Sequence, residues 1–288
     1  MTMTSVFAQQ IWNGLVTGMA YVLFSMGLNL IFGILGVINM AHGELYMLGA
    51  MLLWTTTTIL HLNFFLGILL SVVIVGLLGI VFNRLAVKPI IGADPLSIML
   101  STMAMSVILM YATMVLWNTD ARPIETPFKG SKALGGAVLS NASLVLCGIG
   151  TATLVGVHFF LTRTTIGKAM RATAQDRVGA RLVGIDVNWI YAFTMAVAAA
   201  LAAIAGTIIG PIWVAYPGMG QDMLLKGFAI VVVSGLGNLR ACVITGLLLG
   251  VTEALFSQYI SMYYRDAYAF GIMVIVCLLR PQGLFSRA

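Results

Sequence analysis

Long apolar runs separated by short polar connections make up most of this chain. A helix needs about 20 mostly apolar residues to cross a hydrocarbon core of about 30 Å. Such runs predict transmembrane helices, because a membrane β-barrel would show short strands of alternating polarity. The predicted spans are Ile11–Leu35, His42–Leu60, Phe64–Phe82, Leu96–Trp117, Ser143–Leu161, Trp189–Gly210, Met223–Gly235, Ala241–Ile260 and Ala267–Leu279. The segment Met223–Gly235 is too short to cross alone, so we predict an all-α integral membrane protein with eight or nine transmembrane helices.

The composition supports a membrane location for the whole chain. Of its 288 residues, 60% are hydrophobic and only 8% are charged, whereas soluble domains carry about 25% charged residues. We therefore expect residues 1–288 to form one transmembrane domain whose solvent is the lipid bilayer. The net charge of +6 is expected to orient the chain in the membrane and not to bind nucleic acid. No basic residue precedes the first apolar run, so that span is expected to be retained and not removed as a signal peptide.

Basic residues gather at two connections and at the tail, which the alternation of spans places on one side of the membrane. By the positive-inside tendency that side is the cytosol. The N-terminus then lies in the periplasm and the C-terminus in the cytosol, and the long connection Asn118–Asn141 faces the periplasm. The basic residues concerned are Arg84, Lys88, Arg163, Lys168, Arg171, Arg177, Arg181, Arg280 and Arg287.

A first polar interruption, Gly33–Glu44, separates two long apolar runs and leaves almost no room for a loop. Two interpretations are compatible with its residues. Backbone that unwinds at membrane depth must be buried in protein or line a wet cavity, so Asn39, His42, Gly43 and Glu44 are candidates for a translocation path or gate. Alternatively, the segment is a tight turn at the cytosolic interface in which His42 and Glu44 are simply solvated.

A second interruption, Ser234–Arg240, has the same character, and its glycines permit positive φ angles. We add Gly235, Gly237 and Asn238 to the candidates for the path or gate. Both interruptions predict broken helices of the kind that transporters place at the centre of repeated halves. The two segments share a weak sequence similarity at a common offset, which either an internal repeat or chance explains.

Two ionisable residues fall inside apolar runs, where an unpaired charge is costly. Lys226 is expected to pair with Asp222, four residues earlier on the same helix. Glu253 has no local partner, and three roles stay open for it: contact with a sister subunit, a place on the translocation path, or a neutral carboxyl group. The alanines and glycine of Ala196–Gly206 are interpreted as helix-packing residues.

The longest polar segment, residues 163–188, is rich in Ala and Arg. On a single helix, Ala169, Ala172, Thr173, Asp176, Ala180 and Val183 would share one narrow face. Such a face suits docking into a groove of a soluble partner, although an amphipathic stretch resting on anionic lipid is compatible with the same residues. Gly179 and Gly184 weaken a helix, so two short helices are as compatible as one.

Catalytic and cofactor-binding signals are missing from the sequence. It has no ATP-binding Gly-rich loop and no zinc-hydrolase or serine-hydrolase motif. Cys147, Cys242 and Cys277 stand alone without metal-ligand spacing. We therefore expect neither an enzyme nor a bound metal or cofactor.

Four segments resemble the LivH-type permeases of branched-chain amino acid ABC importers. Gly36–Ala50 is similar to the signature of that family, and the stretch from Arg171 to Ile185 is similar to its cytosolic loop. Ser234–Asn238 and Leu279–Phe285 match in the same order, so that the resemblance covers nearly the whole chain.

The resemblance implies one of two related permease subunits in a bacterial inner-membrane importer. Two cytosolic ATPases would supply the energy and a periplasmic binding protein would deliver the solute. The polar segment resembles an EAA-type coupling helix, which implies ATPase docking through Arg171, Ala172, Thr173, Asp176, Ala180 and Gly184. Family members serve branched-chain amino acids, urea, amides or aromatic acids, and the sequence does not choose among them. The alternative is an autonomous ion-coupled carrier or channel that uses Glu44, Lys226 and Glu253.

Overall fold

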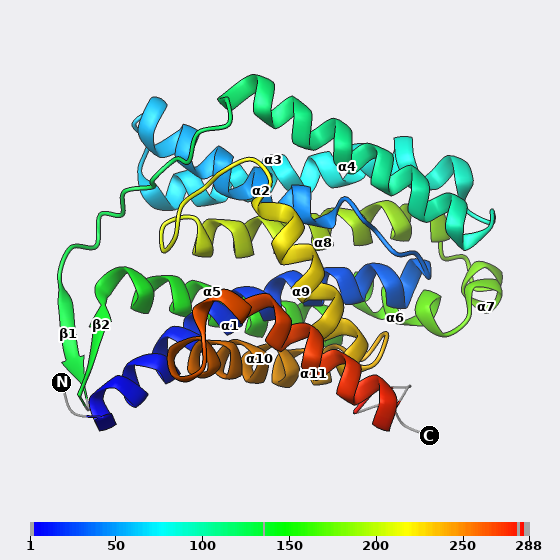
Figure 1. The fold of residues 1–288 in the computed structure, drawn as a ribbon. Helices are drawn as coiled ribbons and strands as arrows, with labels where there is room; N and C mark the ends of the chain where they lie inside the picture. The colour runs from blue at the N-terminus through cyan, green and yellow to red at the C-terminus, as the bar shows by residue number, and fades with distance from the viewer. Residues whose placement is uncertain (1–2, 135, 281–282, 285–288) are drawn as a thin grey trace.

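The computed structural model describes residues 3–134, 136–280 and 283–284 and consists mainly of long helices lying side by side (Figure 1). Short π-helical turns, Thr55–Ile59 and Asn83–Val87, extend α2 and α3. Short 3-10 turns at Lys88–Ile90 and Met262–Tyr264 precede α4 and α11. The helices are α1 Met3–Leu35, α2 His42–Trp54, α3 Phe64–Phe82, α4 Pro95–Trp117, α5 Asn141–Arg163, α6 Thr165–Gln175, α7 Arg177–Leu182, α8 Val187–Ile209, α9 Met219–Ser234, α10 Leu239–Tyr259 and α11 Arg265–Leu279.

Each predicted span coincides with a helix, and the predicted multi-pass all-α fold is confirmed. Seven helices among the described residues are long and apolar enough to cross a membrane. The two remaining predicted spans correspond to α2 and α9, which are shorter. The connection between α4 and α5 was not predicted to contain regular structure, yet it forms an antiparallel hairpin of β1 (Ser131–Leu134) and β2 (Ala137–Ser140).

The helices form two groups, with α9 crossing between them (Figure 1). One group contains α2, α3, α4 and α8, and the other contains α1, α5, α10 and α11. Helix α9 contacts members of both groups. Helices α1 and α8 are buried along most of their length, whereas α4, α5 and α11 present most of their surface outward. Helix α9 therefore links the two groups, which also contact each other directly through α1 and α8.

The described ends of the chain lie at opposite ends of the molecule. The start of α1 and the β-hairpin are at one end, and the end of α11 lies with α6 and α7 at the other (Figure 1). The connection between α3 and α4 is also at the end that carries α6 and α7. The basic connections therefore share one side of the molecule, as predicted from the alternation of spans.

Close helix contacts are made through small residues, because apolar burial gives little drive for association in lipid. A Cβ added to Gly250 of α10 would lie 2.5 Å from the Cα of Gly18 in α1, and one added to Gly49 of α2 would lie 2.5 Å from the Cα of Ala203 in α8. The alanines of the predicted packing stripe on α8, including Ala198, Ala202 and Ala203, are fully buried. The scaffold thus depends on backbones that touch.

We expect Gly250→Val to destabilise the protein, because the new side chain overlaps the backbone of α1. Overpacking of this kind costs about 1–3 kcal/mol. The measurement is the temperature at which the detergent-solubilised protein loses monodispersity. Gly148→Val is the matched control, because a Cβ there meets nothing within 4 Å; equal loss of stability in both variants would contradict the packing argument.

Candidate functional site

The first interruption lies deep inside the fold. Helix α1 ends at Leu35, Gly36 adopts a φ of +68°, and α2 begins at His42. The Nε2 atom of His42 lies 3.2 Å from the carbonyl oxygen of Phe24. Phe24 is eleven residues before Leu35, or about 16 Å of helix at 1.5 Å per residue. Helix α2 therefore begins beside a point about two-thirds of the way along α1 and not at its end, as expected for an interrupted helix.

The polar side chains of the first interruption are buried, and each has one atom with a partner in the protein and one without. The side chains of Asn39, His42 and Glu44 are at most 1% exposed. The hydroxyl of Ser106 in α4 donates to Glu44 at 3.1 Å, and the amide of Met40 donates to the hydroxyl of Thr102 at 3.1 Å. The interpretation as a solvated cytosolic turn is wrong, because α1 and α4 cover these residues.

Glycines bring the first turns of α2 and α9 into direct contact. A Cβ on Gly43 would overlap the carbonyl oxygen of Gly220, and a Cβ on Gly220 would overlap that of Gly43. The N-terminal ends of two short helices therefore meet inside the protein. Both ends carry partial positive charge from unpaired backbone N–H groups.

The second interruption lies against the last turns of α1. Gly235 and Gly237 have φ angles of +87° and +84°, as predicted from the glycines. The amide of Gly237 donates to the Oδ1 atom of Asn29 at 2.6 Å, and a Cβ on Gly33 would lie 3.4 Å from the Cα of Gly237. Residues after α11 reach the same place, because the amide of Leu284 donates to the carbonyl of Val233 at 2.9 Å.

A cavity of about 1240 Å³ opens beside the second interruption. Gly235, Gly237 and Asn238 line it together with Asn29, and α6 contributes residues including Arg171. The first interruption reaches this cavity only through Gly33 and Ile34, whereas its predicted path residues Asn39, His42, Gly43 and Glu44 are absent from the wall. The structure thus separates the two sets of predicted path residues, one lining a cavity and the other enclosed in protein.

The polar segment folds as two helices with a sharp break at Asp176. This residue has an extended backbone (φ −149°, ψ 109°), and its Oδ1 atom accepts from the amide of Val178 at 2.9 Å as the N-cap of α7. The break falls at Asp176 and not at Gly179. Gly184 follows α7 with a φ of +86°.

The break rearranges the residues predicted to dock a partner. Thr173 and Ala180 are buried against the rest of this chain, and Ala172 is half-buried. Arg171, Asp176 and Gly184 are exposed. The structure also exposes apolar side chains on and after α7, which the single-helix face did not bring together: Val178, Leu182 and Val183 are 67%, 83% and 76% exposed.

Arg177, the first residue of α7, joins the polar segment to the first interruption. Its Nη2 atom donates to the carbonyl oxygen of Leu35 at 2.8 Å, and its guanidinium lies 5.9 Å from the ring of Tyr191. A cation at the C-terminal end of a helix satisfies carbonyl groups that have no partner within the helix. Arg177 was not among the predicted site residues, since its sequence context does not separate it from the solvated arginines nearby.

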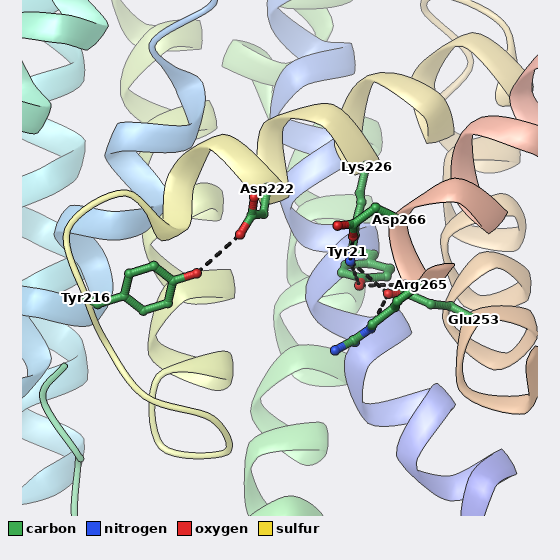
Figure 2. A network of polar contacts seen from close by, with 7 residues as sticks. All are labelled: Tyr21, Tyr216, Asp222, Lys226, Glu253, Arg265 and Asp266. Atoms are coloured by element: carbon green, nitrogen blue, oxygen red, sulfur yellow. Dashed lines mark hydrogen bonds and ion pairs between the residues drawn. The ribbon is translucent and has the colours of Figure 1, made fainter. Parts of the chain in front are cut away.

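A cluster of charged residues joins α1, α9, α10 and α11 (Figure 2). The Nζ atom of Lys226 lies 2.7 Å from Glu253 and 3.0 Å from Asp266. The Nε atom of Arg265 pairs with the same Oε1 atom of Glu253, and the hydroxyl of Tyr21 donates to Oε2 at 2.7 Å. Glu253 is 1% exposed. The two cations balance the charge of its carboxylate, and the hydroxyl of Tyr21 donates a hydrogen bond to it.

The predicted pair between Lys226 and Asp222 is wrong. Asp222 instead accepts from the hydroxyl of Tyr216 at 3.2 Å, and Figure 2 shows these two side chains apart from the charged cluster. Lys226 pairs instead with carboxylates of two other helices, the buried Glu253 and the exposed Asp266. Glu253 does have partners within its own chain, namely Tyr21, Lys226 and Arg265.

Comparisons with known proteins identify the family. Residues 10–277 match the family described as the branched-chain amino acid transport system / permease component. The chain belongs to this family.

Several relatives and one solved structure resemble this permease. It is 32% identical to the high-affinity branched-chain amino acid transport system permease protein BraD of Pseudomonas aeruginosa, covering 98% of this chain and 96% of that protein. It is 30% identical to LivH of Escherichia coli over the same shares, and 24% identical to LivM of that organism over 92% and 68%. The structure of PsaBC from Streptococcus pneumoniae in complex with Fab resembles it in fold, with a TM-score of 0.52 at 16% identity over 94% of this permease and 91% of that chain.

Glu253→Gln is expected to destabilise the permease strongly. It leaves Lys226 with only the exposed Asp266 and removes the ion pair of Arg265 with Glu253, and breaking a buried ion pair costs about 3–5 kcal/mol. The double variant Glu253→Gln with Lys226→Met removes one charge of each sign and should recover much of the thermal stability. The control is Asp120→Asn, whose carboxylate is 71% exposed. A double variant less stable than Glu253→Gln would contradict the pairing.

Proposed function

We propose that the chain is the permease subunit of an ATP-driven importer in the bacterial inner membrane. It forms, as one transmembrane domain, half of a translocation path for branched-chain amino acids or a related small polar solute. The observation that carries the proposal is the match of residues 10–277 to permease components, in a chain whose polar segment is exposed at one end. The names of BraD and LivH supply the solute class.

The partners follow from the same comparison. Similarity to both LivH and LivM, two separate permeases of one organism, supports pairing with a second related permease. The sequence lacks an ATP-binding loop, so the energy comes from two separate ATPases, and a periplasmic binding protein delivers the solute. The end that carries α6 and α7 faces the cytosol, and the start of α1 faces the periplasm.

The ATPase docks on the exposed face of α6 and α7. Val178, Leu182 and Val183 provide an apolar patch, and exposed apolar side chains rimmed by polar residues are typical of interaction sites. Arg171, Asp176 and Gly184 surround it, whereas Thr173 and Ala180 anchor the segment to the body of the permease. A face held in this way transmits force to the helices behind it.

Arg177 transmits movement of the docked segment to the path. Its hydrogen bond to Leu35 joins α7 to the end of α1, and Asn29 of α1 holds Gly237 of the second interruption. Closure of the ATPases therefore shifts both interruptions together. The cavity beside Gly235, Gly237 and Asn238 is the inner part of the path, and Asn39, His42, Gly43, Glu44 and Glu253 belong to the elements that gate it.

Leu182→Glu tests the docking surface. A buried carboxylate in the interface should abolish co-purification of the ATPase while the transmembrane fold persists, as judged by monodispersity. Tyr263→Glu is the control, since Tyr263 is fully exposed and lies outside the polar segment. Retained ATPase capture by Leu182→Glu would overturn the docking surface. Uptake driven by an ion gradient in proteoliposomes without ATPase would favour an autonomous carrier instead.

Arg177→Gln is expected to uncouple transport from ATP hydrolysis. A hydrogen bond from a charged group is worth about 1.5–3 kcal/mol, so solute imported per ATP hydrolysed should fall about tenfold or more while the ATPase stays bound. Arg181→Gln changes the same charge on an exposed position of α7 and should leave the ratio unchanged. Equal ratios for Arg177→Gln and the unmodified importer would contradict the proposed route.

A further inference from the structure

A second cavity, of about 240 Å³, lies over the charged cluster. Residues of α1, α2, α8, α9 and α11 and of the connection between α8 and α9 line it. A single water molecule needs only about 10–15 Å³ of such a cavity. The cavity is therefore large enough for one small amino acid.

The polar part of its wall carries charges of both signs. Lys226 and Arg265 contribute cations, and Asp222 and Asp266 contribute carboxylates. The guanidinium of Arg265 lies 4.2 Å from the centre of the Trp213 ring, and Figure 2 shows its end pointing away from Glu253. A guanidinium has five N–H donors, and the Nε donor is the one that Glu253 accepts. The guanidinium also hydrogen-bonds the hydroxyl of Tyr21, and the donors that remain can bind a further carboxylate.

The remainder of the wall is largely apolar. Ile209, Met219 and Met223 line the cavity and are at most 8% exposed. Methionine side chains adapt to apolar groups of different shape. The cavity therefore has a charged part and an apolar part. A ligand that carries one positive and one negative group beside a branched aliphatic side chain would match both parts.

We propose that this cavity is a binding site for a zwitterionic α-amino acid with an aliphatic side chain. The proposal rests on the function proposed above and locates a solute site in this chain. The solute carboxylate binds Lys226 and Arg265, and its ammonium group binds Asp222. Tyr216 holds Asp222 in place.

Asp266 acts as the exchangeable carboxylate of the empty site. Its side chain is 65% exposed, whereas that of Glu253 is 1% exposed, and both pair with Lys226. A solute carboxylate replaces Asp266 beside Lys226 while Glu253 stays in place, so the buried cation is never left without a partner. The two cations face three carboxylates in all (Glu253, Asp266 and Asp222), and a zwitterion adds no net charge to them. Because Asp266 lies in the first turn of α11, this exchange also joins solute binding to that helix.

The test measures direct ligand binding to the complete permease–ATPase complex in lipid nanodiscs, without binding protein or nucleotide. Saturation-transfer NMR compares L-leucine with 4-methylpentanoate, which lacks the ammonium group, and with 3-methylbutylamine, which lacks the carboxylate. L-leucine is expected to bind most tightly of the three. Asp222→Asn keeps an acceptor for Tyr216. It should lower the affinity for L-leucine about tenfold without lowering the affinity for 4-methylpentanoate.

A second variant is expected to change ligand affinity in the opposite direction. Asp266→Asn removes the competing carboxylate and should strengthen binding of both L-leucine and 4-methylpentanoate several-fold. Glu125→Gln, an exposed charge change outside the cavity, should change neither. The proposed site is overturned if L-leucine does not bind saturably, if it binds no better than 4-methylpentanoate, or if Asp222→Asn weakens both ligands equally.

A separate readout distinguishes this failure from failure of the proposed function. ATP-dependent uptake of L-leucine by the full importer, with its binding protein present, tests the function alone. Uptake without binding in the cavity would contradict only the proposed solute site. Failure of the unmodified chain to associate with an ATPase would contradict the proposed function.

Discussion

The structure depends on the requirement that a helix ending inside a membrane must have its freed backbone groups covered by protein. In hydrocarbon, each unpaired N–H or C=O group costs several kcal/mol. This chain meets the requirement in the same way at both interruptions. Side chains of neighbouring helices, Thr102 at the first interruption and Asn29 at the second, bind freed amides. Glycines allow the close approach, as where Gly43 meets Gly220.

The interruptions connect the two ends of the molecule. On one side, Arg177 of α7 donates to the last carbonyl of α1, and the second interruption faces a cavity that α6 also lines. On the other side, α9 carries Lys226 into the charged cluster with Glu253, Arg265 and Asp266. Helix α9 therefore has an interruption at its C-terminal end and buried charges further along. In the proposed function, a push on α7 and a solute at the cluster act on the same helix.

Much of the fold could be predicted from local patterns in the sequence. The apolar runs located the helices, because span length and hydropathy are local properties. Glycine at positions 235 and 237 predicted the positive φ angles found there, since few other residues adopt them easily. The polar residues of Gly33–Glu44 allowed two interpretations, a solvated turn or a break on a translocation path. Burial of His42 and Glu44 contradicts the solvated turn, and the role in a path stays a prediction.

What could not be predicted depended on contacts between distant parts of the chain. Asp222 was a reasonable helical partner for Lys226, but Glu253, 27 residues away, holds it at 2.7 Å. The face expected on residues 163–188 assumed an unbroken helix, and the extended backbone of Asp176 turned α7 in another direction. Arg177 looked like any solvated arginine until its partner, 142 residues earlier, was known.

The most direct test is a pair of structures of the assembled importer, one without nucleotide and one with bound ATP. The account predicts that the ATPase covers Val178 and Leu182, and that the segment from Leu35 to His42 shifts with Arg177 when ATP binds. An ATPase seated elsewhere, with α7 free of any neighbour, would contradict it. So would a segment that keeps its position relative to Thr102 while α7 moves.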